Sequence, residues 1–388
     1  MNFAEMEEIV ALRDMLRRYV ADNCPPEKVE KWDREDFIPR QELRSLGGLG
    51  VCGICVPEEY GGLGSSVMGV VAVIEELARS SAGLATYYSM CVLAAGYIIT
   101  KFGSQEQKSR ILPDVVKGNV AFSYGLSEPG VGADLGEVST RADRSGDRIV
   151  INGAKRWTSG ASMNEYILAL VRSGPPEAKR RNLSFVLIPT GAAGVTITEL
   201  GSMGHNGTPL TDVSFDDVEL SIEDVLGGAA GWSEGWSMLA GPALESEKLV
   251  SPAIALGIAE AALAEAWEYS QQRIQGGKRI CGHQTIRHAL ADARTELQAC
   301  RLLLMHAAWQ VQEQAPSAVA TSMAKLFVAE RAKAVTLACQ QQVMGAYGYA
   351  YGFQMQRYVR DILAVPIYGG SSAIMRNNIA NLLGLPRA

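Results

Sequence analysis

Residues Ser127–Gly160, SEPGVGADLGEVSTRADRSGDRIVINGAKRWTSG, mark the point where the chain changes character. They open on a glycine-rich loop and continue with residues rich in Val, Ile and Thr, with Gly146 at the tip of a hairpin turn. The loop lacks G-x-G-x-x-G spacing and no alternation of strands and helices follows, so a Rossmann dinucleotide site is not supported. The stretch instead predicts the start of an antiparallel β domain.

Helical periodicity flanks this β region on both sides. Before it, apolar residues recur three and four apart in 7–24, 40–50, 69–81 and 104–118. After the strands expected at 164–173, 182–190, 194–201 and 211–220, the period returns in a long amphipathic stretch, 236–274, and again in 284–314 and 318–349. We therefore predict an α+β multidomain fold with an N-terminal helical domain (1–119), a middle antiparallel β domain (120–232) and a C-terminal four-helix bundle (233–388).

The composition excludes several classes of protein. The chain has 388 residues, is 47% hydrophobic and carries a net charge of −6, so it has the composition of a soluble globular protein. No stripe of Lys and Arg points to nucleic acid. The 21 residues Ser80–Thr100 carry no formal charge, but their Ser, Thr, Gly and Tyr content favours a buried helix over a membrane span.

The seven cysteines are odd in number and follow no signal peptide, which predicts reduced thiols in a cytoplasm. Cys52 and Cys55 form a C-x-x-C without a second pair, so buried small side chains are favoured over a redox or metal role. The four histidines have no metal-ligand spacing. The sequence therefore predicts no metal.

Two stretches could hold a flat cofactor. The glycines of the Tyr124–Thr140 loop would let a planar ligand approach the main chain, although a surface turn explains them as well. Trp157, beside Thr158 and Ser159, offers a stacking face with hydroxyl donors, or is simply a core tryptophan.

Two further stretches lie in the C-terminal third. Glu245 and Glu247 are two apart on a predicted helix and point about 200° apart, so one could face a cavity, or both could face solvent. The turn YGGSSAIMR, Tyr368–Arg376, enters a helix whose free N–H groups could hold a pyrophosphate, or Ser371 or Ser372 could simply cap that helix.

Taken together, the order and spacing of these motifs resemble the acyl-CoA dehydrogenases, FAD enzymes that desaturate acyl thioesters. The resemblance runs almost end to end and is carried by VPEEYGGLG, Ser127–Gly160, VSFDDVELSIEDVLG, QVMGAYGYAYGFQMQRYVRD and IYGGSSAIMRNNIANLLG. It implies α-proton abstraction paired with transfer of a β-hydride to the flavin N5.

The resemblance also assigns cofactor contacts. Around the flavin ring it implies Leu126 and Ser127 at the ring edge, Trp157 against the ring, Ser159 near N5, and the neighbouring Tyr124, Gly132, Ala133 and Thr158. From a neighbouring subunit it implies Arg273 on the pyrophosphate, with Gln284, Gln342 and Gly345, and from the C-terminal turn Ser371 and Ala373. Such shared sites imply a homotetramer built as a dimer of dimers.

The catalytic base is assigned from a position at which this sequence differs from the family pattern. Many members carry a glutamate directly after the tyrosine of Y-x-G, but here Gly369 follows Tyr368. A branch that includes isovaleryl-CoA dehydrogenase places the glutamate on the long C-terminal helix, and SEKLV puts Glu247 at that position. Gly369 would then leave room for the carboxylate, and Glu245 would point away.

The substrate is less defined. By resemblance the substrate contacts are Ala133, Glu245, Lys248, Tyr368 and Gly369, and by position Tyr87, Tyr88 and Met90 line the pocket. Departures from the family pattern at Ala133, His205-Asn206, Lys248 and Gly276 leave open acyl-CoA or an acyl carrier protein. We expect an electron-transfer flavoprotein as acceptor; the alternatives are an oxidase or flavin monooxygenase of the same fold, or a non-catalytic FAD-binding subunit.

Overall fold

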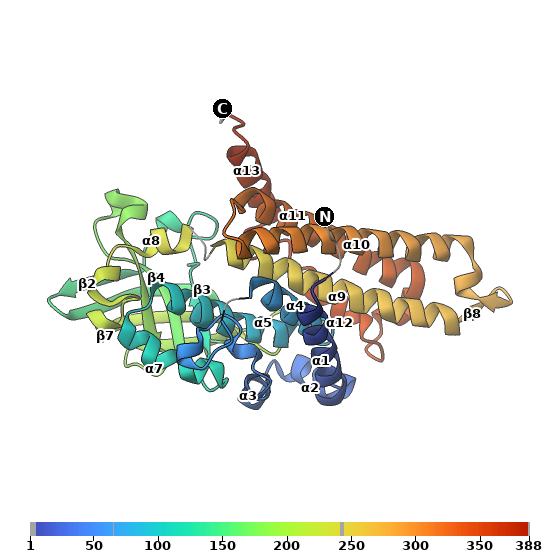
Figure 1. The fold of residues 1–388 in the computed structure, drawn as a ribbon, viewed down its shortest axis with the longest axis horizontal. Coiled ribbons are helices and arrows are strands. Elements are labelled where there is room, and N and C mark those ends of the chain that lie inside the picture. Colours follow the sequence, from blue (N-terminus) through green and yellow to red (C-terminus); the bar gives the residue numbers. More distant parts are fainter. Residues whose placement is uncertain (1–4, 65, 241–243, 387–388) are drawn as a thin grey trace.

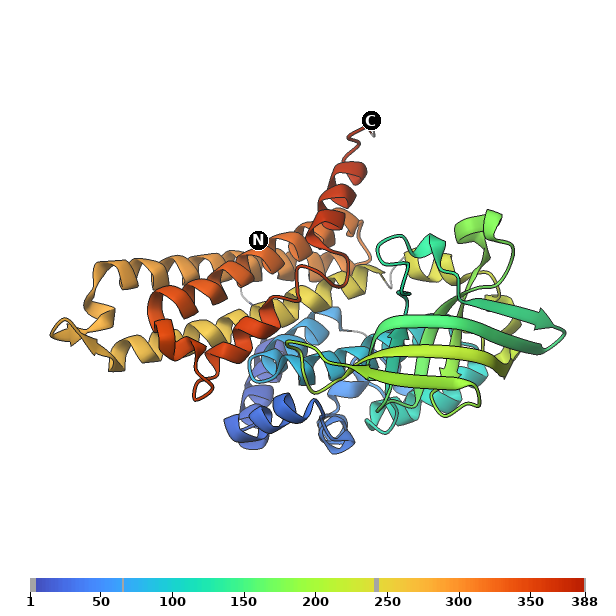
Figure 2. The ribbon, with the colours of Figure 1, turned by 180° about the vertical axis from the view of Figure 1, so that it is seen from behind.

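The structure, a computed structural model, describes residues 5–64, 66–240 and 244–386. A curled β domain occupies one end, long helices extend away from it, and the N-terminal helices pack alongside their junction (Figure 1). The view from behind shows the same order, with the C-terminal helix projecting from that junction (Figure 2). The layering is the one that the sequence predicts.

The N-terminal helices cover the junction between the other two parts. They are α1 (Glu7–Asn23), α2 (Pro26–Glu35), α3 (Arg40–Gly48), α4 (Val67–Ala78), α5 (Ala82–Met90), the π-helix η3 (Cys91–Ile99), α6 (Thr100–Phe102) and α7 (Gln105–Val116). The uncharged stretch from Ser80 to Thr100 becomes α5 and η3, whose described side chains are mostly buried. Cys52 and Cys55 are both buried with free thiols.

The middle sheet has seven strands in the order β1-β4-β2-β3-β7-β6, with β5 beside β4. Their bounds are β1 (Phe122–Gly125), β2 (Arg141–Ser145), β3 (Arg148–Ser159), β4 (Tyr166–Arg172), β5 (Leu183–Pro189), β6 (Val195–Leu200) and β7 (Leu210–Ser221). The pairs β2–β3, β3–β7, β4–β5 and β6–β7 are antiparallel.

The predicted antiparallel sheet has two parallel pairings. β1 pairs with β4 in parallel, with Tyr124 opposite Leu168, and β2 meets β4 in parallel at Arg141 and Arg172. A parallel return needs a long connection. The loop and the β2–β3 hairpin between β1 and β4 supply that length, a relation that strand periodicity does not encode.

The C-terminal part is built on three long helices, α9 (Leu244–Gln272), α10 (Gln284–Gln312) and α11 (Ala318–Ala338). Shorter elements complete it: α8 (Gly235–Met238), β8 (Ile274–Gln275), β9 (Lys278–Arg279), the π-helix η10 (Cys339–Met344), α12 (Met355–Ile362) and α13 (Ser372–Leu382). α9 packs on α10, α11 and α12, and α13 packs on α11.

The helix α9 is buried on every side over more than half of its length, so its prediction as amphipathic is wrong there, although its last turns, from Ala264, have exposed residues. Every residue from Lys248 to Leu263 is buried, because α4 covers the face that the bundle leaves free. At Gly257 a Cβ would lie 2.4 Å from the carbonyl oxygen of Glu75, so glycine is needed for this close approach. In the described chain one segment, Glu247–Gln272, is apolar and long enough to cross a membrane, but 89% of its most apolar window is buried, as in a core helix.

Candidate active site

A carboxylate stands at the first turn of α9, where the bundle meets the β domain. Glu247 is half-buried. Burial raises the pKa of its carboxyl, and the nearby cations Lys325 and Lys248 oppose that rise. A carboxylate with a raised pKa is a stronger base than an ordinary carboxylate.

Gly369 lies directly across from this carboxylate, although it comes far later in the chain. A Cβ on Gly369 would lie 3.9 Å from Oε1 of Glu247 and 3.7 Å from Oγ of Ser251. These are ordinary contact distances, so a methyl group alone would fit and only a longer side chain would occupy the recess. The φ of Gly369 is +62°, a left-handed conformation that favours glycine. The glycine therefore serves the turn as well as the space.

Glu245 and Lys248 hold each other. Nζ of Lys248 lies 2.8 Å from Oε1 of Glu245, and the hydroxyl of Thr321 on α11 donates to the second carboxylate oxygen of Glu245. Glu245 is thus tied to α11 rather than left in solvent, and Lys248 is buried. Both of these predicted substrate contacts have structural partners of their own.

Tyr368, just before Gly369, sits between two basic side chains. Nζ of Lys325 lies 5.3 Å from the centre of its ring, and the imidazole of His205 meets the ring edge-on at 5.5 Å. The Tyr368 hydroxyl is buried with no hydrogen-bond partner in the described structure. Burial raises the pKa of Tyr368, as do the charges of Asp361 and Glu247, which places this hydroxyl within electrostatic range of Glu247.

Sequence patterns did not single out Lys325. It is the one charge in the run SMAKLFVA of α11, and that charge on an apolar helix was the available signal. Its Nζ donates to the carbonyl of Val365 at 2.5 Å. The fold brings this lysine, Tyr368 and Glu247 together from three separate elements.

On the β side, the glycine-rich loop and the tryptophan segment lie against each other. The carbonyl of Ser127 accepts from the backbone N–H of Arg156 at 2.9 Å, and Nζ of Lys155 donates to the carbonyl of Leu126 at 3.3 Å. Lys155 also forms a buried pair with Glu128 at 2.8 Å. The two stretches therefore make one site.

Trp157 occupies a bulge on β3, where the register against β7 shifts between Lys155 and Thr158. Its φ is +64°, an unusual conformation for a bulky residue, and 57% of the residue is exposed. The guanidinium of Arg156 covers one face of its ring at 5.0 Å, and the buried hydroxyl of Thr158 has no partner in the described structure. Trp157 is thus not a core tryptophan.

Other predicted ring contacts surround this bulge. Tyr124 on β1 is half-buried, and its pKa is raised by burial and by the charge of Glu247, which links the β side to the carboxylate. Ser159 is half-buried at the end of β3, opposite Leu210. Gly132 and Ala133 are exposed.

A second group of predicted cofactor residues lies at the far end of the bundle. Arg273 follows α9, and its guanidinium lies 5.1 Å from the ring centre of Tyr347. Gln342 is exposed in η10, Gly345 directly follows η10, and Gln284 begins α10. The β8 hairpin beside Arg273 is at the opposite end of the molecule from β3 (Figures 1 and 2). One chain does not bring this group to Trp157.

The remaining predicted positions lie at the start of α13 and on α5. The hydroxyl of Ser371 accepts from the backbone N–H of Ile374 at 3.3 Å, so Ser371 caps the helix; Ala373 is exposed. Tyr87 and Tyr88 are fully buried, and the Tyr88 hydroxyl donates to Val51. The Met90 Cε would lie 3.3 Å from a Cβ on Gly160, beside the end of β3.

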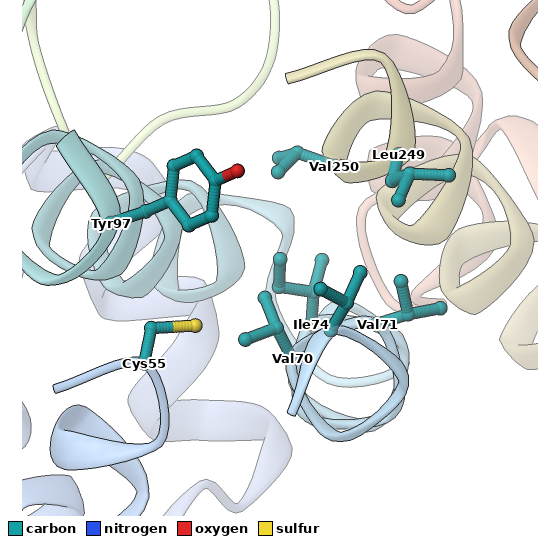
Figure 3. Close-up of a pocket in the computed structure, with 8 residues that line it drawn as sticks. Cys55, Val70, Val71, Ile74, Tyr97, Leu249 and Val250 are labelled. Carbon is teal, nitrogen blue, oxygen red and sulfur yellow. The ribbon is translucent and has the colours of Figure 1, made fainter. Parts of the chain in front are cut away.

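A small apolar cavity lies next to the first turns of α9 (Figure 3). Its volume is about 20 Å³, and it is lined by Cys55, Val67, Val70, Val71, Ile74, Tyr97, Leu249 and Val250. Val250 lies three residues after Glu247, on the same side of the helix. In the close-up the Tyr97 ring extends from η3 toward Val250 (Figure 3). Among the described residues, no group of three or more His, Cys, Asp or Glu side chains could hold a metal.

Comparison with known proteins assigns the family. Sequence profiles match in succession: the acyl-CoA dehydrogenase N-terminal domain at 6–119, middle domain at 123–218 and C-terminal domain at 233–384. The chain is 33% identical to the mitochondrial isobutyryl-CoA dehydrogenase of Dictyostelium discoideum over 349 residues, covering 89% of this chain and 82% of that protein.

Solved structures agree. Butyryl-CoA dehydrogenase of Megasphaera elsdenii superposes with a TM-score of 0.92 at 28% identity, covering 99% of this chain and 100% of that one. A chain from the study of the electron transferring flavoprotein of Acidaminococcus fermentans and flavin-based electron bifurcation superposes with a TM-score of 0.93 at 30% identity, with full coverage of both chains. The predicted resemblance and fold class are confirmed. With all three domains matched in order, the chain belongs to the acyl-CoA dehydrogenase family of flavin-dependent oxidoreductases acting on CH–CH bonds.

Proposed function

We propose that this protein catalyses the FAD-dependent α,β-dehydrogenation of a short acyl thioester, with Glu247 as the base. The observation that carries the proposal is the half-buried Glu247 carboxylate facing Gly369, within electrostatic range of Tyr124 on the β side. The position normally occupied by an acid in many relatives is a glycine here, and the carboxylate reaches the same recess from α9.

The β-side residues fit a flavin. The exposed face of Trp157, the unpartnered hydroxyl of Thr158 and the main chain of Leu126 and Ser127 offer a stacking surface beside hydrogen-bonding groups. We assign the ring contacts to these residues together with Tyr124, Gly132, Ala133 and Ser159. When bound, FAD supplies the acceptor for the β-hydride at N5.

Glu247 would remove the α-proton. Burial raises the pKa of this carboxyl, which matches it better to a weakly acidic carbon, and Lys325 and Lys248 keep it able to ionise. Tyr368 and Gly369 form the opposite wall of the recess. They shape and dry it and contribute no acid or base.

The small cavity supports a short acyl group. A volume of about 20 Å³ admits little more than one water-sized group such as a methyl. Its lining has no charged side chain, which disfavours a second carboxylate on the acyl group. The isobutyryl-CoA and butyryl-CoA named for two relatives carry short acyl groups, of which such a cavity would admit the terminal methyl. We propose CoA as the carrier, with a carrier protein as the alternative, and an electron-transfer flavoprotein as acceptor.

The two distant groups of cofactor residues support a homotetramer. Arg273 directly precedes β8, which lies at the opposite end of the molecule from β3, the strand that carries Trp157 (Figure 1). Gln342 and Gly345 precede Tyr347, which contacts Arg273, so we expect this group to serve an FAD at Trp157 only across subunits. Large apolar side chains are exposed on α10, α11 and after α13, including Leu302, Met323, Phe327 and Leu383, as expected of faces that another copy covers. The buried free cysteines fit a reducing cytoplasm.

Anaerobic titration of the yellow protein with acyl-CoAs tests the reaction. We expect butyryl-CoA or isobutyryl-CoA to bleach the flavin and octanoyl-CoA to do so poorly. Glu247→Gln should keep FAD and lose at least about 100-fold in bleaching rate, while Glu268→Gln, an exposed glutamate later on α9, should not change it. Full activity in Glu247→Gln would contradict the assignment, and rapid peroxide formation in air would favour an oxidase.

The assembly has its own test. Light scattering should give a mass of four chains, and Arg273→Ala should lower FAD retention without lowering helical content. A monomer that retains FAD would contradict the shared site.

A further inference from the structure

A buried lysine lies behind the turn that faces Glu247. Lys325 on α11 is 1% exposed. Its ammonium donates to the carbonyl of Val365 at 2.5 Å and lies 5.3 Å from the ring centre of Tyr368. Val365 and Tyr368 flank the segment that leads into Gly369. The lysine therefore supports the backbone of that turn from behind.

The charge of Lys325 has few opposite charges in range. Among the described residues, Lys325 forms no ion pair within 4 Å, and the carboxylates that act on it are Glu247 and Glu330. Glu330 already pairs with Lys333 at 3.1 Å. Burial of an ammonium is costly without a counter-charge, so Glu247 is the carboxylate left to balance it.

The charged groups around Glu247 also indicate Lys325 as its counter-charge. Lys248 follows Glu247 on α9 but is paired with Glu245 at 2.8 Å. Tyr124 on β1 and Tyr368 on the C-terminal turn face the carboxylate with uncharged hydroxyls, because burial raises the pKa of both. Among the residues that the structure describes, the remaining uncompensated cation that acts on Glu247 is the buried Lys325 of α11.

Two groups behind the tyrosine do not change this balance. The backbone N–H of His205 donates to the Asp361 carboxylate at 2.7 Å, and its Nε2 lies 2.9 Å from the Asp361 carbonyl. Burial lowers the pKa of His205 and raises that of Asp361. The charges of the two groups act on each other, and neither is among the charges that act on Glu247, which are those of Lys325 and Lys248.

We propose that Lys325 is a positioning residue for Glu247, which it serves in two ways: it ties the Val365–Gly369 turn to α11, so that Gly369 stays opposite Glu247, and it is the counter-charge that lets Glu247 ionise in its recess. The proposal rests on the proposed function only in taking Glu247 as the base. No relation between these two residues is visible from their spacing in the sequence.

The charge effect sets the expected size of the change. An opposite charge near a buried carboxylate lowers its pKa by about 1–3 units, and more when closer. Since Lys325 and Glu247 are not in direct contact, we expect the lower end, about one pH unit. Removing the cation would then reduce the ionised fraction of Glu247 about tenfold at a pH below its titration midpoint.

Three substitutions of Lys325 separate the effect of its charge from the effect of its hydrogen bond to the Val365 carbonyl. Lys325→Met removes both, Lys325→Gln removes the charge but can still donate to the Val365 carbonyl, and Lys325→Arg keeps the charge. Lys333→Met on the same helix, whose lysine pairs with Glu330 rather than facing Glu247, is the matched control. Lys325→Gln keeps the test available if Lys325→Met does not fold.

The readout is the protonation of Glu247 itself in the full-length, FAD-loaded protein. Infrared difference spectra against pH would follow its carboxyl band, assigned by its absence in Glu247→Gln. We expect the midpoint to rise by about one unit in Lys325→Met and Lys325→Gln and to stay within a few tenths in Lys325→Arg and Lys333→Met. The acid limb of kcat/KM against pH should shift equally.

Two results are decisive and separable. A Glu247 midpoint unchanged in both Lys325→Met and Lys325→Gln would overturn the inference and leave the proposed function standing. Full turnover in Glu247→Gln would overturn the proposed base, while a shifted carboxyl band would still establish the link between the two residues. Equal kcat in Lys325→Met and Lys325→Gln, with the shift present, would remove the supporting role and keep the electrostatic one.

Discussion

Replacing Lys155 by methionine should destabilise the glycine-rich loop Tyr124–Thr140, because Lys155 contacts two residues of that loop. Its ammonium pairs with Glu128 at 2.8 Å and donates to the carbonyl of Leu126 at 3.3 Å, and neither Lys155 nor Glu128 is exposed. Burial opposes ionisation of Glu128, yet Lys155 and the bonds from Ser139 hold the pKa of this carboxyl at about 2. The carboxylate therefore depends on its lysine.

The expected loss in unfolding free energy depends on the hydrogen bonds that Glu128 keeps in the variant. Removing one partner of a buried pair costs about 3–5 kcal/mol. Glu128 would keep its hydrogen bonds from the N–H and hydroxyl of Ser139 and the N–H of Thr140, so we expect the lower end, about 3 kcal/mol. The double variant Lys155→Met/Glu128→Gln removes the unpaired charge and should recover most of that loss.

Urea unfolding at fixed FAD concentration measures these differences. The loss in Lys155→Met should shrink on acidification below pH 4.5, the ordinary pKa of this carboxyl, because a protonated Glu128 no longer needs a cation. A loss below about 1 kcal/mol, or a double variant less stable than the single one, would refute this account of the loop.

Three further outcomes are expected. Gly369→Ala should cost about 1 kcal/mol in unfolding free energy from its left-handed φ of +62°, with little loss of activity, since its Cβ meets no atom closer than 3.7 Å; a large loss of kcat would show that the recess is tighter. Tyr97→Ala should enlarge the cavity, cost about 3 kcal/mol and move the substrate preference toward longer acyl chains in a bleaching panel. The stabilising contribution of Glu247 should be complete below its ordinary pKa of 4.5 and be lost as pH rises through its raised folded value, so Glu247→Gln should flatten unfolding free energy against pH there.

The sequence was most informative where a pattern is local. The run 147–160 predicts β3 (Arg148–Ser159) because its Val, Ile and Thr content and the turn at Gly146 are local features that need no knowledge of the rest of the fold. The periodic stretches 7–24 and 318–349 likewise predict α1 and α11. Local patterns gave wrong predictions where contacts between residues far apart in the sequence determine the structure. The helix α4 covers the face of α9 that was expected to be exposed, and β1 pairs in parallel with β4.

The residues of the candidate site likewise divide into those that the sequence predicts and those that only the fold brings together. Glu247 and Gly369 were paired through the family resemblance, since no periodicity links residues so far apart. The fold then brings them so close that a Cβ on Gly369 would lie 3.9 Å from the Glu247 carboxylate. Lys325 and Lys155 were missed because a lysine on an apolar helix or strand gives no sign of which carbonyl it will reach. The sequence alone allows Trp157 to be either a core residue or a cofactor contact. The bulge at its position in β3 leaves the residue exposed.

Lys155 and Lys325, the two lysines that the sequence did not single out, have the same structural role. Lys155 donates to the carbonyl of Leu126 and Lys325 to that of Val365, and each carbonyl belongs to a segment that borders the site. An apolar side chain in either place would remove the side-chain donor that each carbonyl has here. Burial lowers the pKa of both ammonium groups to about 8, against the pull of Glu128 and Glu247 respectively. Since the unfolded chain binds these protons more tightly, both lysines make folding less favourable below pH 8, and this penalty fades as pH rises toward 10.5. The fold accepts that cost at two points, and at each the lysine fixes a backbone carbonyl and lies in range of one carboxylate, Glu128 for Lys155 and Glu247 for Lys325.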